Sequence, residues 1–226
     1  RLIRRQRQMC IRDSRKYTDP LIEEELRNFL TVQYKDKNLT TSEMDSIVAN
    51  LRNTGGQNDY YALRNAFLLY RDGYDFAYSD GRDNPFRLEY IDFEHPDHNI
   101  FRCVNQFVME QGRENRRPDI LLFINGIPVC IIELKNPTKQ NATIHDAHTQ
   151  ICTRYMRDIP ALLKYCALAV ISDGAKNALG TTYTPFEFFY EWKKIENEDK
   201  AGKGLDTLRT LIRGALSPER ILEILR

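Results

Sequence analysis

The chain has 226 residues, 42% of them hydrophobic, which is enough for a substantial core in one large domain with additions. A formal net charge of +1 excludes a globally basic nucleic-acid-binding surface, and no apolar run approaches the roughly 20 residues of a membrane helix. We recognise no secretion signal, and five widely spaced cysteines favour buried thiols in a reducing cytoplasm over a disulfide framework.

Residues 1–16 are strongly basic and have no clean apolar periodicity. They could form a nucleic-acid-binding arm. We favour a non-native or disordered segment, because it resembles translated adapter sequence at the end of a sequenced fragment. The native N-terminus would then be missing.

Residues 17–73 predict a helical N-terminal part with three amphipathic helices. The helices have start and stop signals: Asp19-Pro20 opens the first, a Thr40/Glu43 capping box opens the second, and the third runs from about residue 59 to 72, ending at Gly73. We expect their apolar faces, including Tyr60, to form core.

Strand-like runs follow at residues 74–78, 87–93 and 100–109, separated by polar turns. We expect them to begin, in antiparallel fashion, the mixed sheet of a core that spans residues 74–183. His95 and His98 lie in one of the turns. Two histidines without further ligands are more often solvated than metal-bound, so we predict no metal site there.

Residues 117–137 predict a central β-hairpin, because two nearly continuous apolar runs flank an Asn125-Gly126 turn signal. Charged residues stand at its open end: Asp119 begins the first strand, and Glu133 and Lys135 end the second on one face. A two-residue turn would leave Asp119 on the wrong side of Glu133. We therefore predict a three- or five-residue loop, which would place Asp119 opposite Glu133.

Such a site has a defined chemistry. Two carboxylates with the backbone carbonyl of Leu134 between them make a hard oxygen site for Mg²⁺ or Mn²⁺. An adjacent lysine can orient water and stabilise charge on a phosphate. Asp119, Glu133 and Lys135 are therefore the predicted catalytic residues of phosphodiester hydrolysis, and Asp119, Glu133 and Leu134 the metal ligands.

The sequence RPDILLFINGIPVCIIELKNP resembles the PD-(D/E)xK nuclease motif and, more narrowly, the N-terminal endonuclease domain of type I restriction enzyme restriction subunits. The resemblance implies an α/β fold with a restriction-endonuclease-like core: a mixed central sheet flanked by helices, with helical N- and C-terminal additions. It also implies a further glutamate on an upstream helix. We expect truncation to have removed it, because Glu23, Glu24 and Glu25 are explained by a solvated first turn.

A helix is predicted over residues 143–157, followed by a buried strand at 167–172. The resemblance implies a Gln-x-x-x-Tyr motif on this helix, and Gln150 and Tyr155 are the candidates although they are five residues apart. Side chains at that spacing are about 140° apart on an α-helix, so both reach the site only if the helix is irregular. Otherwise Gln150 faces solvent and Tyr155 the core.

Basic residues near this end of the hairpin are candidates for DNA phosphate contacts, which position DNA without reading sequence. They are Arg116, Arg117, Lys139, Arg154 and Arg157. Residues 184–226 predict a helical extension that starts at Thr184-Pro185 and includes two short helices near 205–212 and 221–225.

The expected function is Mg²⁺-dependent cleavage of double-stranded DNA in the cytoplasm. The resemblance further implies modification and specificity subunits as partners, and ATP use only through a translocase motor absent from this chain. Two alternatives remain: a related repair-type nuclease, and a non-catalytic DNA-binding or scaffold fragment that truncation has inactivated.

Overall fold

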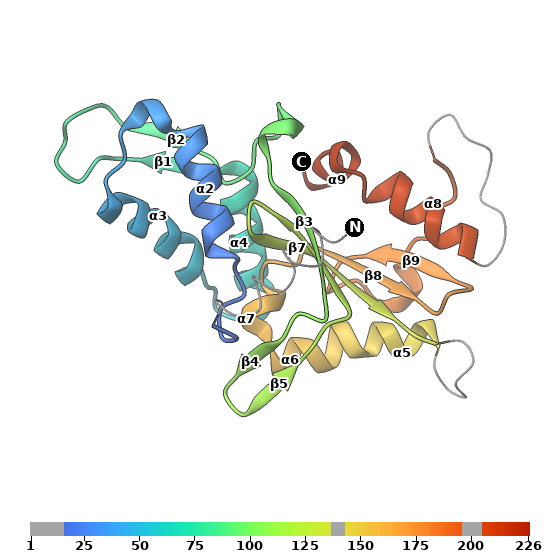
Figure 1. The fold of residues 1–226 in the computed structure, drawn as a ribbon. Coiled ribbons are helices and arrows are strands. Elements are labelled where there is room, and N and C mark those ends of the chain that lie inside the picture. The colour runs from blue at the N-terminus through green and yellow to red at the C-terminus, as the bar shows by residue number, and fades with distance from the viewer. Residues whose placement is uncertain (1–15, 137–142, 196–204) are drawn as a thin grey trace, which may run out of the picture.

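A five-stranded mixed sheet forms the centre of the chain, in the order β3-β6-β7-β8-β9 (Figure 1). The computed structural model describes residues 16–136, 143–195 and 205–226. The strands are β3 (Phe101–Asn105), β6 (Ile120–Ile124), β7 (Ile127–Leu134), β8 (Leu168–Ser172) and β9 (Asn177–Gly180). Neighbours are antiparallel except β7 and β8, which are parallel. The predicted α/β class with a mixed central sheet is confirmed.

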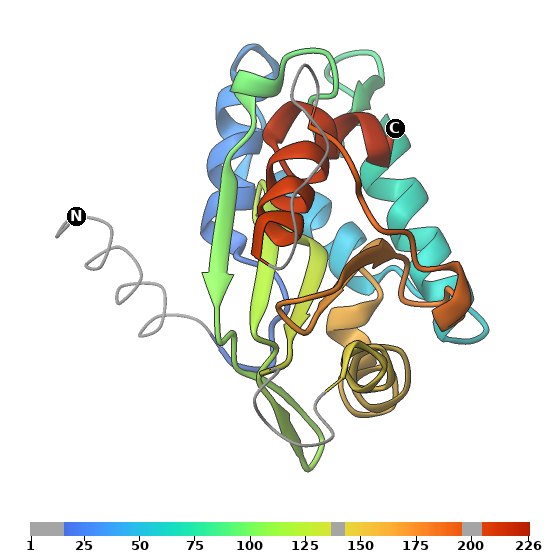
Figure 2. The same cartoon turned by 90° about the vertical axis from the view of Figure 1, so that its right-hand side faces the viewer.

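Helices bury both faces of this sheet. One core, which includes Ile124, Ile132 and Val170, takes in residues of α2 (Glu23–Gln33), α3 (Thr41–Asn53), α4 (Asp59–Asp72), α8 (Leu205–Ala215) and α9 (Pro218–Leu225). The other, which includes Leu121, Ile131 and Ile171, takes in α5 (Ile144–Thr149), η3 (Gln150–Tyr155), α6 (Met156–Asp158) and α7 (Pro160–Leu163). Figure 2 shows β3 at one edge of the sheet. The continuous helical segment formed by α5, η3 and α6 is seen nearly end-on below the strands.

Short elements complete the fold. They are β1 (Tyr74–Phe76), β2 (Phe86–Leu88), β4 (Met109–Gln111), β5 (Glu114–Arg116) and the 3₁₀ turns η1 (Lys35–Lys37), η2 (Pro96–His98) and η4 (Phe186–Phe188). Within the described ranges, no helix is long and apolar enough to cross a membrane.

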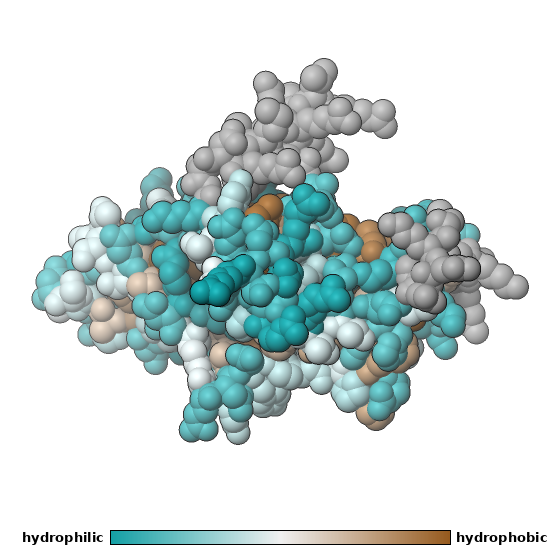
Figure 3. Space-filling view, turned by 90° about the horizontal axis from the view of Figure 1, so that it is seen from below, coloured by the Kyte–Doolittle hydropathy of each residue, from teal (hydrophilic) through white to brown (hydrophobic). Residues whose placement is uncertain are grey.

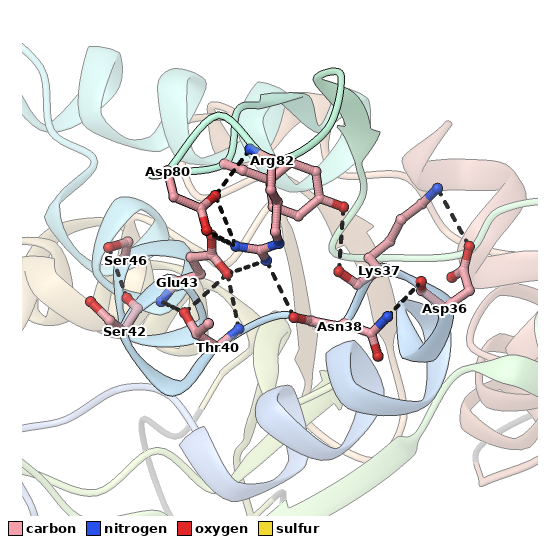
Figure 4. Close-up of polar contacts among 10 residues, drawn as sticks. Asp36, Lys37, Asn38, Thr40, Ser42, Glu43, Ser46, Asp80 and Arg82 are labelled. Carbon is pink, nitrogen blue, oxygen red and sulfur yellow. Dashed lines mark hydrogen bonds and ion pairs between the residues drawn. The ribbon is translucent and has the colours of Figure 1, made fainter.

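The N-terminal helices follow local signals. The Thr40/Glu43 capping box opens α3, and Gly73 ends α4. The Glu43 carboxylate also binds Arg82 at 2.7 Å, which ties the start of α3 to the loop after β1 (Figure 4). This hydrogen bond to Arg82 is the main reason why the pKa of Glu43 is lowered to about 2.

Two details of this region were wrongly predicted. Asp19 does not cap α2, which begins at Glu23; its carboxylate accepts a hydrogen bond from the Leu21 amide at 3.0 Å and binds Arg52 at 2.7 Å instead. Tyr60 is not core, because it is 50% exposed at the start of α4.

Four predictions about strands, helices and thiols are also corrected. β1 and β2 pair with each other in a separate two-stranded sheet and do not join the central sheet. Gln106, with φ of 53°, breaks the run 100–109 after β3. No long helix starts at Thr184: Tyr190 pairs with Leu179 by two backbone hydrogen bonds of 2.8 Å, which hold this segment extended beside β9. Cys103 is an exposed thiol.

Candidate active site

The hairpin of β6 and β7 turns at two residues. Asn125 and Gly126 both have positive φ, of 51° and 78°, and Ile124 pairs with Ile127. Two-residue turns in which both residues have positive φ match the right-handed twist of the flanking strands. The predicted three- or five-residue loop is therefore wrong.

A β-bulge in β7 nevertheless brings the two carboxylates together. Phe123 pairs with Pro128 and Leu122 with Cys130, so Val129 is an extra residue. Beyond it Ile120 pairs with Ile132, and the register places Asp119, one residue before β6, opposite Glu133. Both then lie on the sheet face covered by α5 and η3, which an unbulged two-residue hairpin would not allow.

Asp119 is held on both sides. Its Oδ1 accepts a hydrogen bond from the Gln106 side chain and its Oδ2 from the Leu134 amide, each at 2.9 Å. The backbone amide of Gln106 also donates a hydrogen bond to the backbone carbonyl of Asp119 at 2.8 Å. Sequence reasoning missed Gln106, because nothing local distinguishes it from any polar residue at a strand end.

Glu133 is 3% exposed, and its burial and the nearby Asp119 charge raise its pKa to about 7. Lys135 Nζ lies 3.1 Å from Glu133 Oε1 and offsets part of this cost. The pair of carboxylates thus creates a buried site that favours a cation.

Gln150 and Tyr155 both reach Glu133, because η3 is a π-helix. Hydrogen bonds in a π-helix run from residue i to i+5, which is the spacing of these two residues. Gln150 Oε1 accepts from Lys135 at 2.5 Å, and its amide donates to Glu133 and, at 2.6 Å, to the Tyr155 hydroxyl. The Tyr155 hydroxyl donates to Glu133 Oε2 at 3.3 Å. The irregularity that both residues need is therefore present.

The candidate phosphate ligands divide into two groups. Arg116 and Arg157 both bind the buried Asp158, at 2.7 and 2.6 Å, although the Arg157 side chain is still 71% exposed. Arg117 and Arg154 are exposed, and Lys139 lies outside the described residues. Seen from below, the molecular surface on the side of α5 and α6 is mainly hydrophilic, with small apolar areas (Figure 3).

The acidic first turn of α2 lies far from this site. The Ile22 amide donates to the Gly126 carbonyl at 2.9 Å, so α2 starts at the turn end of the hairpin. Asp119 is at the other end, roughly 20 Å away at 3.3 Å per residue. Glu23, Glu24 and Glu25 therefore lie too far from Asp119 to join this site.

The donor set fits a hard divalent cation. Asp119 and Glu133 offer carboxylate oxygens and Leu134 a backbone carbonyl, the ligand types that Mg²⁺ prefers. Each Asp119 oxygen takes one of the hydrogen bonds described above and keeps a second lone pair for a metal.

Comparison with known proteins places the chain in one family. The family described as type I restriction enzyme R protein N terminus matches residues 4–188. The chain is 30% identical over 207 residues to the type I restriction enzyme HindI endonuclease subunit of Haemophilus influenzae, covering 90% of this chain and 19% of that protein. It is 34% identical over 157 residues to the putative type I restriction enzyme MjaIXP endonuclease subunit of Methanocaldococcus jannaschii, covering 61% and 15%.

The chain thus spans about a fifth or less of the length of these relatives. The family match covers most of the chain and includes the hairpin, the π-helix and every candidate catalytic residue. This chain belongs to the family of N-terminal domains of type I restriction enzyme R proteins.

Proposed function

We propose that this chain is a nuclease domain that hydrolyses phosphodiester bonds of double-stranded DNA with Mg²⁺, or Mn²⁺ in its place. The observation that carries the proposal is the convergence of Asp119, Glu133 and Lys135 on one face at the end of the hairpin. A buried carboxylate, Glu133, beside the half-buried Asp119 and a lysine costs stability, and such arrangements concentrate at functional sites.

Asp119, Glu133 and the Leu134 carbonyl would hold the cation. When bound, Mg²⁺ polarises a phosphate oxygen and makes water more acidic. Gln106 and the Leu134 amide fix the Asp119 carboxylate before any ligand arrives, so little reorganisation is needed.

Lys135 would orient the attacking water and stabilise negative charge on the phosphate, because its ammonium has three donors and no acceptor. Gln150 restrains Lys135 from one side, and Glu133 from the other. Tyr155 supports Glu133 from the π-helix. Arg117, Arg154 and Lys139 would contact DNA phosphates outside this site.

Nicking of supercoiled plasmid by this chain tests the proposal. Cleavage should require Mg²⁺ or Mn²⁺ and fall by at least about 100-fold in Asp119→Ala and in Lys135→Ala, since each removes an interaction with the transition state. Lys35→Ala, an exposed lysine in η1, is the matched control and should cleave like the parent. Parent-like cleavage by both site variants would refute the assignment.

Calorimetry separates binding from catalysis. Mg²⁺ should bind the parent and Lys135→Ala but not Glu133→Gln, which keeps the shape and loses the charge. A parent chain that binds Mg²⁺ at this site without cutting DNA would favour the non-catalytic fragment over the nuclease.

The two relatives described above are named as endonuclease subunits of type I restriction enzymes. We place this domain in such a subunit, acting in the cytoplasm with modification and specificity subunits. ATP-driven translocation would belong to the longer protein. Co-purification of this chain's full-length protein with both partner subunits would test the placement.

A further inference from the structure

A second group of metal-binding side chains lies in the loop between β2 and β3. Asp92, His95 and His98 each offer one ligand atom, and the three atoms lie within 4.8 Å of one another. Sequence reasoning dismissed the two histidines because it saw no third ligand. Asp92, three residues before His95 in the same loop, supplies the third ligand, and its carboxylate faces both imidazoles.

The distances fit a tetrahedral transition-metal site. Asp92 Oδ2 is 2.9 Å from His98 Nδ1 and 3.4 Å from His95 Nδ1. Ligand atoms around tetrahedral Zn²⁺ are about 3.4 Å apart, given metal–ligand bonds of about 2.0–2.2 Å. His95 Nδ1 already lies at this spacing from the Asp92 oxygen. His98 Nδ1 is hydrogen-bonded to the same oxygen, and metal binding would replace this hydrogen bond and lengthen the distance from 2.9 to about 3.4 Å.

Hydrogen bonds from the protein hold the Asp92 carboxylate in place. Asp92 is 5% exposed, and its Oδ1 accepts hydrogen bonds from the Glu94 and His95 amides at 3.0 and 2.9 Å. Gln33 donates to Oδ2 at 3.3 Å, which orients the metal-facing oxygen. The histidines are 65% and 54% exposed in their side chains, so water can complete the coordination.

The loop backbone is held as firmly. The Asp92 amide donates to Asn99 Oδ1 at 2.9 Å, and Asn99 Nδ2 donates to the Asp92 carbonyl at 2.7 Å. Asn125 of the hairpin turn donates to the same Asn99 oxygen at 2.8 Å. The cluster therefore sits at the turn end of the hairpin, away from Asp119 and Glu133.

We propose that Asp92, His95 and His98 bind one divalent transition-metal ion of the Zn²⁺ class. Two imidazoles with one carboxylate favour Zn²⁺ and its neighbours over Mg²⁺, which prefers oxygen ligands only. The ion would clamp the loop that supports Asn125 and so stabilise the hairpin turn. It would act independently of the catalytic cation.

Titration calorimetry with Zn²⁺ tests the site on chain that is first stripped of metals and then held in excess Mg²⁺, so that the Asp119 and Glu133 site is already occupied. One equivalent should bind, and affinity should fall by at least about tenfold in His95→Ala and in His98→Ala. Both histidines are exposed, so these variants should fold, which circular dichroism verifies.

His145→Ala is the matched control, because His145 and His148 are also three residues apart, on α5. It should leave Zn²⁺ affinity unchanged, as should Cys103→Ser and Asp119→Ala. Equal affinity in the parent and both loop variants would overturn the proposal. So would loss of binding in any of the three control variants while the loop variants still bind.

Discussion

Asp119 and Glu133 face each other across β6 and β7 although the turn that joins these strands has only two residues. The extra residue that the geometry requires is Val129, inside the strand. Val129 and Cys130 consequently both belong to the core that includes α2, α3 and α4, where strict alternation would put them on opposite faces. The face on which Asp119 and Glu133 meet is thus coupled to packing on the opposite side of the sheet.

Gly126→Ala tests the fit of the hairpin turn against α2. Gly126 has φ of +78°, and an added Cβ would lie 2.2 Å from the Ile22 carbonyl oxygen. We expect the substitution to lower the free energy of unfolding by about 3 kcal/mol, from backbone strain and steric overlap together. Urea denaturation followed by circular dichroism measures it.

Gly81→Ala is the matched control for this substitution. Gly81 has φ of +66° and no atom within 4 Å of the added Cβ, so only strain remains, about 1 kcal/mol. Equal losses in the two variants would show that the contact with Ile22 is unimportant.

Deletion of Thr153 tests the π-helix. An i to i+5 turn holds one residue more than an α-helical turn, so removing the exposed Thr153 should convert η3 to α-helix. Gln150 and the tyrosine would then be four apart and still share a face. We expect plasmid cleavage within about tenfold of the parent.

The comparison is deletion of Ser46, an exposed residue in the regular helix α3. That deletion rotates the following turn by about 100° and removes Ile47 and Val48 from the core, so the variant should unfold. An inactive, folded Thr153 deletion would mean that the π-turn itself is needed at the site.

Arg154→Gln and Arg116→Gln should behave differently although both residues lie near the site. Loss of the exposed Arg154 should weaken DNA binding and reduce the slope of log K against log salt by about 1. Loss of Arg116 removes a partner of the buried Asp158, so it should reduce unfolding free energy by about 1–2 kcal/mol and leave the slope unchanged. Fluorescence anisotropy at several salt concentrations tests both, and a changed slope in Arg116→Gln would reassign that residue to DNA.

Glu43 should make part of the fold's stability acid-sensitive. Its pKa is lowered from 4.5 to about 2, mainly by Arg82, so the folded state binds its proton less tightly than the unfolded state. The stabilisation is complete above about pH 5 and is lost as pH falls through 4.5 toward 2. Glu43→Gln should therefore lower Tm most near neutral pH, and less as pH falls.

Glu24→Gln provides the comparison, since Glu24 is an exposed glutamate in the first turn of α2. At neutral pH its Tm should differ from that of the parent by less than the Tm of Glu43→Gln does. A constant Tm difference between Glu43→Gln and the parent from pH 7 to about 2.5 would exclude the Arg82 pair as the source.

The amino-acid sequence alone determined the features that depend on residues close along the chain. These are the Thr40/Glu43 capping box, the glycine that ends α4, the central hairpin, and the placement of Asp119, Glu133 and Lys135 at its open end. Only the tertiary structure decided how these pieces meet. The Val129 bulge, the contact of Gln106 with Asp119 and the contact of Arg116 with Asp158 each depend on pairing or packing between separate elements. A sequence pattern records a residue's own periodicity, whereas register and side-chain partners follow from which packing buries both faces of the sheet at once.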